Sequence, residues 1–267
     1  MSPADPPADR RIDTGVPHSA RVWNYWLGGK DNYPADRSVG DQVKEVFPDI
    51  VEIARLQRAF LGRAITYLAG EAGIRQFLDV GTGLPTADNT HEVAQRVAPD
   101  ARVVYVDNDP LVLTHGRALL TSTSEGVTDY VDADLRDPQR LLAEARRTLD
   151  FGRPVALILM GILGHLPDHE SARRIVTELM AALPSGSYLA LADGTDTDQS
   201  AVEAHRQYNE NAPLPYNLRA PEEIRAFFDG LEPVEPGIVA CTRWRPEPVD
   251  VGAVRDIAEL CAVARKP

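Results

Sequence analysis

The spacing of apolar residues along the chain changes near residue 75. Between residues 50 and 72 apolar residues recur at steps of three and four, which is the spacing of an amphipathic helix. After residue 75 short apolar runs alternate with helical patterns of ten or more residues. Strands that alternate with helices of this length are joined by crossovers, and this arrangement predicts a parallel sheet with helices on both faces.

The pattern predicts seven strands, at residues 77–80, 102–107, 127–131, 154–160, 187–192, 237–244 and 260–264. It predicts helices at residues 19–27, 35–47, 50–72, 87–97, 111–120, 138–149, 169–182, 201–211 and 221–228. The last two strands have no long helix between them, so we expect them to be antiparallel. The predicted fold class is α/β: a Rossmann-like, doubly wound, mostly parallel seven-stranded sheet with an antiparallel C-terminal hairpin and an N-terminal helical cap.

Three regions are expected along the chain. Residues 1–17 hold four prolines among small and charged residues, a composition typical of a flexible leader. Residues 18–73 form the helical cap, whose first helix we expect Ser19 to cap. The polar, glycine-hinged stretch at 28–33 has the composition of a lid over a ligand. Residues 74–267 form the ligand-binding domain.

Composition limits the partners of the protein. The 267-residue chain carries a net charge of -12, which disfavours nucleic acid because phosphate would be repelled. The longest apolar runs are far shorter than a membrane span, and the N-terminus lacks an apolar signal core, so we expect a cytoplasmic protein. Cys241 and Cys261 are interpreted as two buried thiols. No Cys/His spacing resembles a metal site.

The stretch with the clearest chemistry is QFLDVGTGLPT at residues 76–86, an apolar run that ends in two glycines. We interpret it as a buried strand that leads into a turn around a ligand. Asp79 is an acid at the carboxyl end of the strand, while Gly81 and Gly83 let the backbone bend and approach a ligand closely. An ordinary strand-to-helix turn remains the alternative.

Acids also follow the next two predicted strands. A carboxylate such as Asp107 can accept from both hydroxyls of a ribose, whereas Asp109 is placed to cap the following helix. After the third strand, Asp137 precedes a proline as a helix cap, which leaves Asp134 to accept the amino group of an adenine. The fourth strand opens into a glycine-flanked loop that contains His165.

Ribose and adenine contacts are compatible with two different cofactors. A nicotinamide dinucleotide needs a Gly-x-Gly-x-x-Gly turn so that its pyrophosphate can bind at a helix N-terminus. Here Pro85 follows two residues after Gly83, and Ala87 or Asp88 stands where the third glycine would fall.

The whole pattern resembles the class I methyltransferases that use S-adenosylmethionine (SAM). Three stretches are more specific, and they resemble an actinobacterial family of SAM-dependent methyltransferases with largely unassigned substrates. They are ARVWNYWLGGKDNY at residues 20–33, LDVGTGLPT at 78–86 and VDNDP at 106–110. The resemblance covers nearly the whole chain from about residue 18 and implies that SAM is the cofactor.

The resemblance assigns a role to each matching residue. It places the methionine amino end of SAM on Asp79 and the turn, the ribose on Asp107, the adenine beside the third strand, and the sulfonium above the end of the fourth. The implied cofactor residues after the cap are Asp79, Gly81, Thr82, Gly83, Leu84, Asp107, Asn108, Asp134, Leu135, Met160 and Gly161. Within the cap the loop expected to close over the cofactor contributes Gly29, Lys30, Asn32 and Tyr33.

The residues that act on the acceptor are less sharply indicated. His165 is the candidate general base because it follows the fourth strand, where the acceptor enters; a histidine that only bonds a neighbouring loop is the alternative. Tyr33, Tyr208 and Arg219 are candidates for the acceptor pocket.

The favoured hypothesis is an enzyme that transfers methyl from SAM to a small-molecule acceptor, in the first instance a hydroxyl of a specialised metabolite. The alternative is a regulatory module that binds SAM or its product, S-adenosylhomocysteine (SAH), without catalysis. A nicotinamide-dependent oxidoreductase ranks last. The acceptor, the methylated atom and the oligomeric state are left open.

Overall fold

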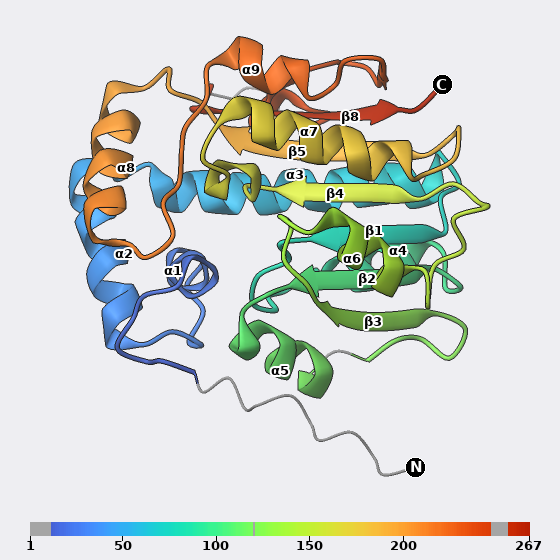
Figure 1. Cartoon of the computed structure of the whole chain (residues 1–267), viewed down its shortest axis with the longest axis horizontal. Helices are drawn as coiled ribbons and strands as arrows, with labels where there is room; N and C mark the ends of the chain where they lie inside the picture. The colour runs from blue at the N-terminus through green and yellow to red at the C-terminus, as the bar shows by residue number, and fades with distance from the viewer. Residues whose placement is uncertain (1–11, 120, 247–255) are drawn as a thin grey trace.

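The computed structural model of the chain describes residues 12–119, 121–246 and 256–267. A mostly parallel sheet lies at the centre, with helices on both faces, as Figure 1 shows. Helices α1, α2 and α8 gather at the end of the sheet where the parallel strands finish (Figure 1). This end is where a ligand site is expected in an open α/β sheet.

Five parallel strands make most of the sheet, in the order β3-β2-β1-β4-β5. Three antiparallel strands extend it, with β8 beside β5 and both β6 and β7 paired to β8. The strand order reverses between β1 and β4, which makes their carboxyl ends the topological switch point. The strands are β1 Gln76–Val80, β2 Arg102–Asp107, β3 Val127–Asp132, β4 Ala156–Met160, β5 Tyr188–Gly194, β6 Glu232–Pro233, β7 Val239–Ala240 and β8 Glu259–Arg265.

Helices α3 and α4 cover one face of the sheet, and α6, α7 and α9 cover the other (Figure 1). The helices are α1 Ser19–Trp26, α2 Pro34–Val46, α3 Ile50–Gly70, α4 Thr90–Val97, α5 Pro110–Leu119, α6 Pro138–Ala145, α7 His169–Ala181, α8 Gln199–Asn211 and α9 Pro221–Ala226. Two short 3-10 helices are η1 Leu163–His165 and η2 Cys241–Arg243.

The alternation of side chains along β1 explains how this strand divides the core. Leu78 and Val80 belong to the apolar cluster shared with α6 and α7, whereas Phe77 belongs to the cluster shared with α3 and α4. Asp79 points to the same face as Phe77 because it is two residues further along the strand. The single acid of β1 therefore faces the α3 and α4 side at the sheet's carboxyl end.

The C-terminal part of the sheet differs from the prediction. The described sheet has eight strands instead of seven, because Glu232–Pro233 also pairs with β8. The strand expected over residues 237–244 is reduced to Val239–Ala240, since the chain turns into η2 directly afterwards. A two-residue strand that contains proline gives no periodic signal, because proline cannot donate to the ladder.

Several element ends also needed correction. His18 precedes α1 and its Nδ1 accepts from the Ala20 amide, so Ser19 is the first helical residue and not the cap. The helix expected from residue 87 begins at Thr90, after a capping box between Asn89 and Glu92. The predicted caps Asp109 and Asp137 are confirmed by their bonds to amides of the following helices. Both cysteines are free and buried, as predicted.

Candidate active site

The turn after β1 is built on two glycines in the left-handed region, Gly81 at φ 74° and Gly83 at φ 66°. A side chain on Gly81 would come within 2.5 Å of Ile162, so the close approach of that loop requires glycine. A Cβ on Gly83 would meet no atom within 4 Å. The turn therefore has open space in front of it, where a ligand can approach the backbone.

Asp107 connects this turn to the end of β2. Its Oδ2 accepts from the Gly83 amide at 3.0 Å, and its Oδ1 accepts from the amides of Asn108 and Asp109 at 2.8 and 2.9 Å. Burial raises the pKa of Asp107, and the amides of Asp109 and Gly83 oppose that rise. The carboxylate is thus fixed in position by the backbone, with lone pairs of Oδ2 left for a ligand.

Asp79 lies at the end of β1 between α3 and α4. Burial raises its pKa to about 6, while the Thr90 hydroxyl, which donates at 2.6 Å, and the Arg58 guanidinium lower it. Arg58 is itself held by the carbonyls of Ala87 and Asp88 at 3.2 and 3.1 Å. The carboxyl group of Asp79 and the guanidinium of Arg58 therefore lie together beside the glycine turn. They can bind the amino group and the carboxylate of an amino acid, respectively.

The end of β3 carries a second acidic position. Asp134 accepts from the Arg136 guanidinium at 2.9 and 2.5 Å and from the Asn108 amide group at 3.3 Å. The hydrogen bond from the Arg136 side chain is the main reason why the pKa of Asp134 is lowered. An adenine amino group would have to share this carboxylate with Arg136.

On the other side of the switch point, β4 ends at Met160 and Gly161. A Cβ on Gly161 would lie 3.1 Å from Gln57 Nε2 and 3.8 Å from the Tyr216 hydroxyl, so these side chains surround the glycine. The Tyr216 hydroxyl donates to the buried carboxylate of Asp193 at 2.6 Å. Gly161 thus faces a group of polar side chains that come from α3, β5 and the segment after α8.

His165 is held by the same segment. Its Nδ1 lies 2.9 Å from the Pro215 carbonyl, which can only accept, so Nδ1 carries the proton and Nε2 the lone pair. Burial lowers the pKa of His165 to about 4. The ring is therefore neutral at physiological pH, in the form that can accept a proton, but it is a weak base.

One cavity of about 200 Å³ joins these groups. Among the predicted site residues, those that line it come from the ends of β1 to β4, the loop at His165 and helix α8. They are Asp79, Gly81, Thr82, Gly83, Leu84, Asp107, Asn108, Asp134, Leu135, Met160, Gly161, His165 and Tyr208. The topology brings them together because the parallel strands all end at this edge of the sheet.

The predicted lid residues do not line this cavity. Gly29 and Asn32 wrap around Asn24 of α1, whose Oδ1 accepts from the Asn32 side chain at 2.9 Å. Asn24 itself lines the cavity, so Gly29 and Asn32 border the cavity through this residue. Lys30 is exposed, and Tyr33 packs on an apolar cluster that includes Leu84.

Arg219 also lies outside the cavity lining. Its guanidinium is 3% exposed and pairs with Asp193 at 3.1 Å, and it donates to the Leu166 carbonyl at 3.3 Å. These contacts hold the segment after α8 against the end of β5. Contact between Arg219 and the acceptor stays a prediction.

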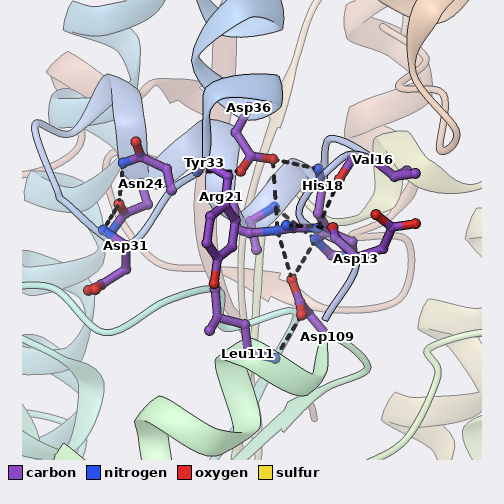
Figure 2. A network of polar contacts seen from close by, with 12 residues as sticks. Asp13, Val16, His18, Arg21, Asn24, Asp31, Tyr33, Asp36, Asp109 and Leu111 are labelled. Carbon is purple, nitrogen blue, oxygen red and sulfur yellow. Dashed lines mark hydrogen bonds and ion pairs between the residues drawn. The ribbon is translucent and has the colours of Figure 1, made fainter. Parts of the chain in front are cut away.

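Figure 2 shows a network of polar contacts that joins the N-terminal segment and α1 to α2 and to the start of α5. Arg21 lies between Asp36, at 3.8 Å, and Asp109, at 3.6 Å, and His18 Nδ1 is 3.0 Å from Asp109. The Arg21 guanidinium also donates to the carbonyls of Asp13 and Val16. Because Asp109 caps α5, the network joins α1 and α2 to the edge of the sheet just beyond Asp107. The leader predicted over residues 1–17 lies partly outside the described residues.

Several cavity residues gave no signal in the sequence motifs. Gln57 and Arg58 come from α3, where Gln57 sits between Ile53 and Leu61 on the apolar stripe. A buried polar residue at an apolar position was the signal that could have identified it. Glu259, directly before the last apolar run, and Tyr216, in an irregular segment, offered no comparable signal.

Comparison with known proteins shows the family of this chain. A family model described as S-adenosyl methyltransferase matches residues 5–267. The chain belongs to the S-adenosyl methyltransferase family. It is therefore a SAM-dependent methyltransferase, and the nicotinamide alternative is wrong. No curated protein matches the chain at a significant level.

Two solved structures are similar to this methyltransferase over nearly its full length. A DUF574 family protein from Streptomyces avermitilis is 49% identical, covers 96% of this chain and 100% of its own, and superposes with a TM-score of 0.92. A candidate methyltransferase from Thermobifida fusca is 44% identical, covers 99% of each chain, and has a TM-score of 0.87. Mitomycin 7-O-methyltransferase, at 16% identity and a TM-score of 0.51 over 92% of this chain and 68% of its own, shares the fold alone.

The site of this methyltransferase fits SAM. The open turn at Gly83 leaves room for the amino-acid part, Asp79 and Arg58 can meet its two charges, and the fixed carboxylate of Asp107 suits a ribose diol. Within the part of the chain that the structure describes, no cluster of side chains could hold a metal ion, and no helix is long and apolar enough for a membrane span.

Proposed function

We propose that this methyltransferase transfers the methyl group of SAM to a hydroxyl of a small molecule, such as a specialised metabolite. The observation that supports this proposal is a single cavity with two different halves. One half has the glycine turn and the carboxylates of Asp79 and Asp107. The other half is walled mainly by apolar side chains of the helical cap and α8.

In the cofactor half each residue has a proposed role. Asp79, Arg58 and the backbone of Gly81 to Leu84 hold the amino-acid part, and Asp107 holds the ribose. Asn108, Asp134 and Leu135 border the adenine, and Met160 and Gly161 form the wall beneath the sulfur. SAM, when bound, supplies a methyl group that a sulfonium makes electrophilic. The protein's main contribution is to align the acceptor with it, an effect of roughly 7–11 kcal/mol in well-oriented reactions.

The acceptor half is mostly apolar. Its wall includes the aromatic side chains of Trp23, Trp26, Phe47 and Tyr208, and a few polar side chains such as His205 interrupt it. A pocket of this kind favours a small, largely apolar molecule whose few polar groups fix its orientation. The net charge of -12 disfavours nucleic acid as the acceptor.

The cap supports exclusion of water from the reaction. Helix α1 contributes Trp23 and Asn24 to the wall, and Arg21 fixes this helix against Asp36 and Asp109 (Figure 2). Excluding water strengthens the polar contacts inside the site. The two buried, free thiols suit a reducing compartment, so we propose the cytoplasm as its location.

Calorimetry with SAM and SAH is the first test, because both must bind if the cavity is the cofactor site. Incubation of the protein with SAM and a library of hydroxyl-bearing metabolites then identifies the acceptor through the release of SAH. Absence of binding to either compound would refute the proposed site. Binding of both without transfer to any acceptor would favour the regulatory module that binds SAM or SAH.

A further inference from the structure

A buried carboxyl group that has no part in the proposed cofactor contacts also lines the cavity. Glu259 is the first residue of β8 and is 2% exposed. Because β8 is antiparallel to β5, with Glu259 opposite Gly194, this residue lies at the edge where the parallel strands end. Its carboxyl group is therefore at the same edge as the cofactor residues.

The carboxylate of Glu259 is only half satisfied. Its Oε1 accepts a hydrogen bond from Gln57 Nε2. Its Oε2 is buried and, within the described ranges, has no well-formed hydrogen bond; the Cys241 thiol, a weak donor, lies close enough to the carboxyl group to lower its pKa. A buried carboxylate oxygen without a strong donor is costly, so a ligand that brings one would be favoured.

Gln57 relates this carboxyl group to the proposed place of the reaction. The amide of Gln57 that binds Glu259 is also the nearest atom to a Cβ built on Gly161, at 3.1 Å. Gly161 belongs to the wall proposed to lie beneath the sulfur. One side chain therefore separates Glu259 from that wall.

We propose that Glu259 accepts the proton that the acceptor hydroxyl loses during methyl transfer. This inference rests on the proposed function. The O–H bond of the acceptor breaks and its proton passes to the Glu259 carboxylate. The acceptor oxygen uses its electron pair to bond the methyl carbon, and the pair of the broken carbon–sulfur bond stays on sulfur. Glu259 then returns the proton to solvent.

The electrostatics of the cavity support this role. Burial raises the pKa of Glu259 to about 7. Hydrogen bonds from the Cys241 thiol and the Gln57 amide lower this pKa, and the charge of Asp193 raises it. A base with a pKa near the working pH is the most effective, whereas the pKa of His165, lowered to about 4, makes it a weaker acceptor.

The other titratable groups around Glu259 have partners or burial of their own that shift their pKa values. Asp193 on β5 is paired with Arg219 and accepts from Tyr216, whose pKa lies well above its usual value because it is buried. Burial likewise raises the pKa of the Cys241 thiol and lowers that of His205, one of three histidines in the cavity wall. Glu259 is thus a buried carboxyl group beside the proposed wall under the sulfur whose charge changes around neutral pH.

Affinities for SAM and SAH, measured by calorimetry across pH, test the proposal without a known acceptor. Only SAM carries the sulfonium charge, so a carboxylate nearby favours SAM over SAH. We expect the ratio of the two affinities to rise roughly tenfold from about pH 6 to about pH 8 in the wild type. Titration of Asp79 cancels in this ratio, since both compounds carry the same amino-acid group.

Three variants make the test specific. Glu259→Gln should bind both compounds with a ratio that does not change with pH. Gln57→Leu removes a donor that lowers the pKa of Glu259, so the rise of the ratio should move to higher pH. Glu232→Gln removes an exposed acid of the neighbouring strand β6, paired with Arg265, and should behave as the wild type.

The outcomes separate this inference from the proposed function. If the wild type binds neither compound, the cofactor site itself is wrong. If it binds both but the ratio is flat, or if Glu259→Gln keeps the wild-type slope, only the role of Glu259 is refuted.

A second test of the proposal measures the rate of methyl transfer from SAM to a panel of phenols and alcohols. We expect kcat/KM of the wild type to rise with pH to a plateau with a midpoint near 7, and Glu259→Gln to lose roughly a hundredfold or more while it still binds SAM. A Glu259→Gln variant with the full rate would overturn the proposal, as would transfer to amines but to none of the hydroxyl compounds.

Discussion

At the scale of single residues, the site depends on carboxylates whose surroundings differ. Asp107 is fixed by three backbone amides, Asp134 by an arginine, and Asp79 by a hydroxyl and a nearby guanidinium. Burial raises the pKa of Asp79 and Asp107, whereas the Arg136 hydrogen bond lowers that of Asp134. Residues of one type can therefore be assigned to different parts of a ligand.

Asp107 gives the most direct test at this scale. Asp107→Ala should weaken SAM binding by about 1–3 kcal/mol, the usual cost of losing a charged hydrogen-bond partner. Calorimetry measures the change, and Asp100→Ala, an exposed acid on the loop before β2, is the matched control. Affinity equal to that of the wild type would show that the ribose is placed wrongly.

Arg58 is predicted to bind the carboxylate of the amino-acid part. Arg58→Met should weaken SAM and SAH equally, by about 1–3 kcal/mol, because both carry this group. Decarboxylated SAM should bind the variant and the wild type alike. A variant that weakens decarboxylated SAM as much as SAM would contradict a direct contact with the carboxylate.

The lowered pKa of His165 makes a prediction about pH. Burial disfavours its charged form, so between about pH 4 and about pH 6.5 the unfolded chain binds more protons at this residue than the folded protein does. Stability at this residue therefore falls as pH falls through that window. Side-chain NMR should show an imidazole that stays neutral down to about pH 5; a midpoint near 6.5 would contradict its burial.

At the scale of elements, α1 is held to the sheet by charge as much as by apolar contact. Its Val22 and Trp26 pack against α2 and α3, while Arg21 bridges to Asp36 on α2 and to Asp109 at the start of α5. The short helix would have little stability alone, because helices of this length are marginal in water. Its position over the cavity depends on these contacts.

Two arginines of the cap allow a matched comparison. Arg21→Met removes the guanidinium that lies between the buried carboxylates of Asp36 and Asp109 and should lower the free energy of unfolding by about 3–5 kcal/mol. Arg37→Met removes an exposed guanidinium that donates to Asn32 and should cost less than about 1 kcal/mol. Urea denaturation measures both, and equal losses would argue against the buried network.

Element boundaries show where the local pattern was sufficient. The long stripe of α3 predicted its extent to within two residues, because three- and four-residue spacing over six turns is a strong signal. The strand expected at 237–244 was wrong in length because its pairing depends on β8, which is distant in sequence. Helix α4 begins at Thr90, three residues after the predicted start, because Asn89 and Glu92 form a capping box.

At the scale of the whole molecule, cap and sheet enclose one cavity. Residues of α1, α3 and α8 and the ends of β1 to β4 all contribute to its wall. A ligand bound between the cap and the sheet should therefore stabilise both against unfolding. SAM at about a hundred times its dissociation constant should add about 2.7 kcal/mol to the free energy of unfolding.

Thermal unfolding with and without SAM measures this linkage, and hydrogen exchange should show added protection in α1 as well as at the turn after β1. Asp107→Ala at the same SAM concentration should show a smaller shift. Protection limited to the strand ends, with α1 unchanged, would contradict a cap that takes part in binding.

By itself the sequence determined the parallel sheet, the glycine turn and the acids that follow β1, β2 and β3, because alternating patterns and strand ends are local properties. Only the tertiary structure placed Gln57, Arg58, Tyr216 and Glu259 on the cavity wall. These residues come from three segments far apart in the chain, and long-range packing alone brings them together. The same packing held the loop at residues 29–32 around Asn24 and buried Arg219 against Asp193, which no local pattern could have indicated.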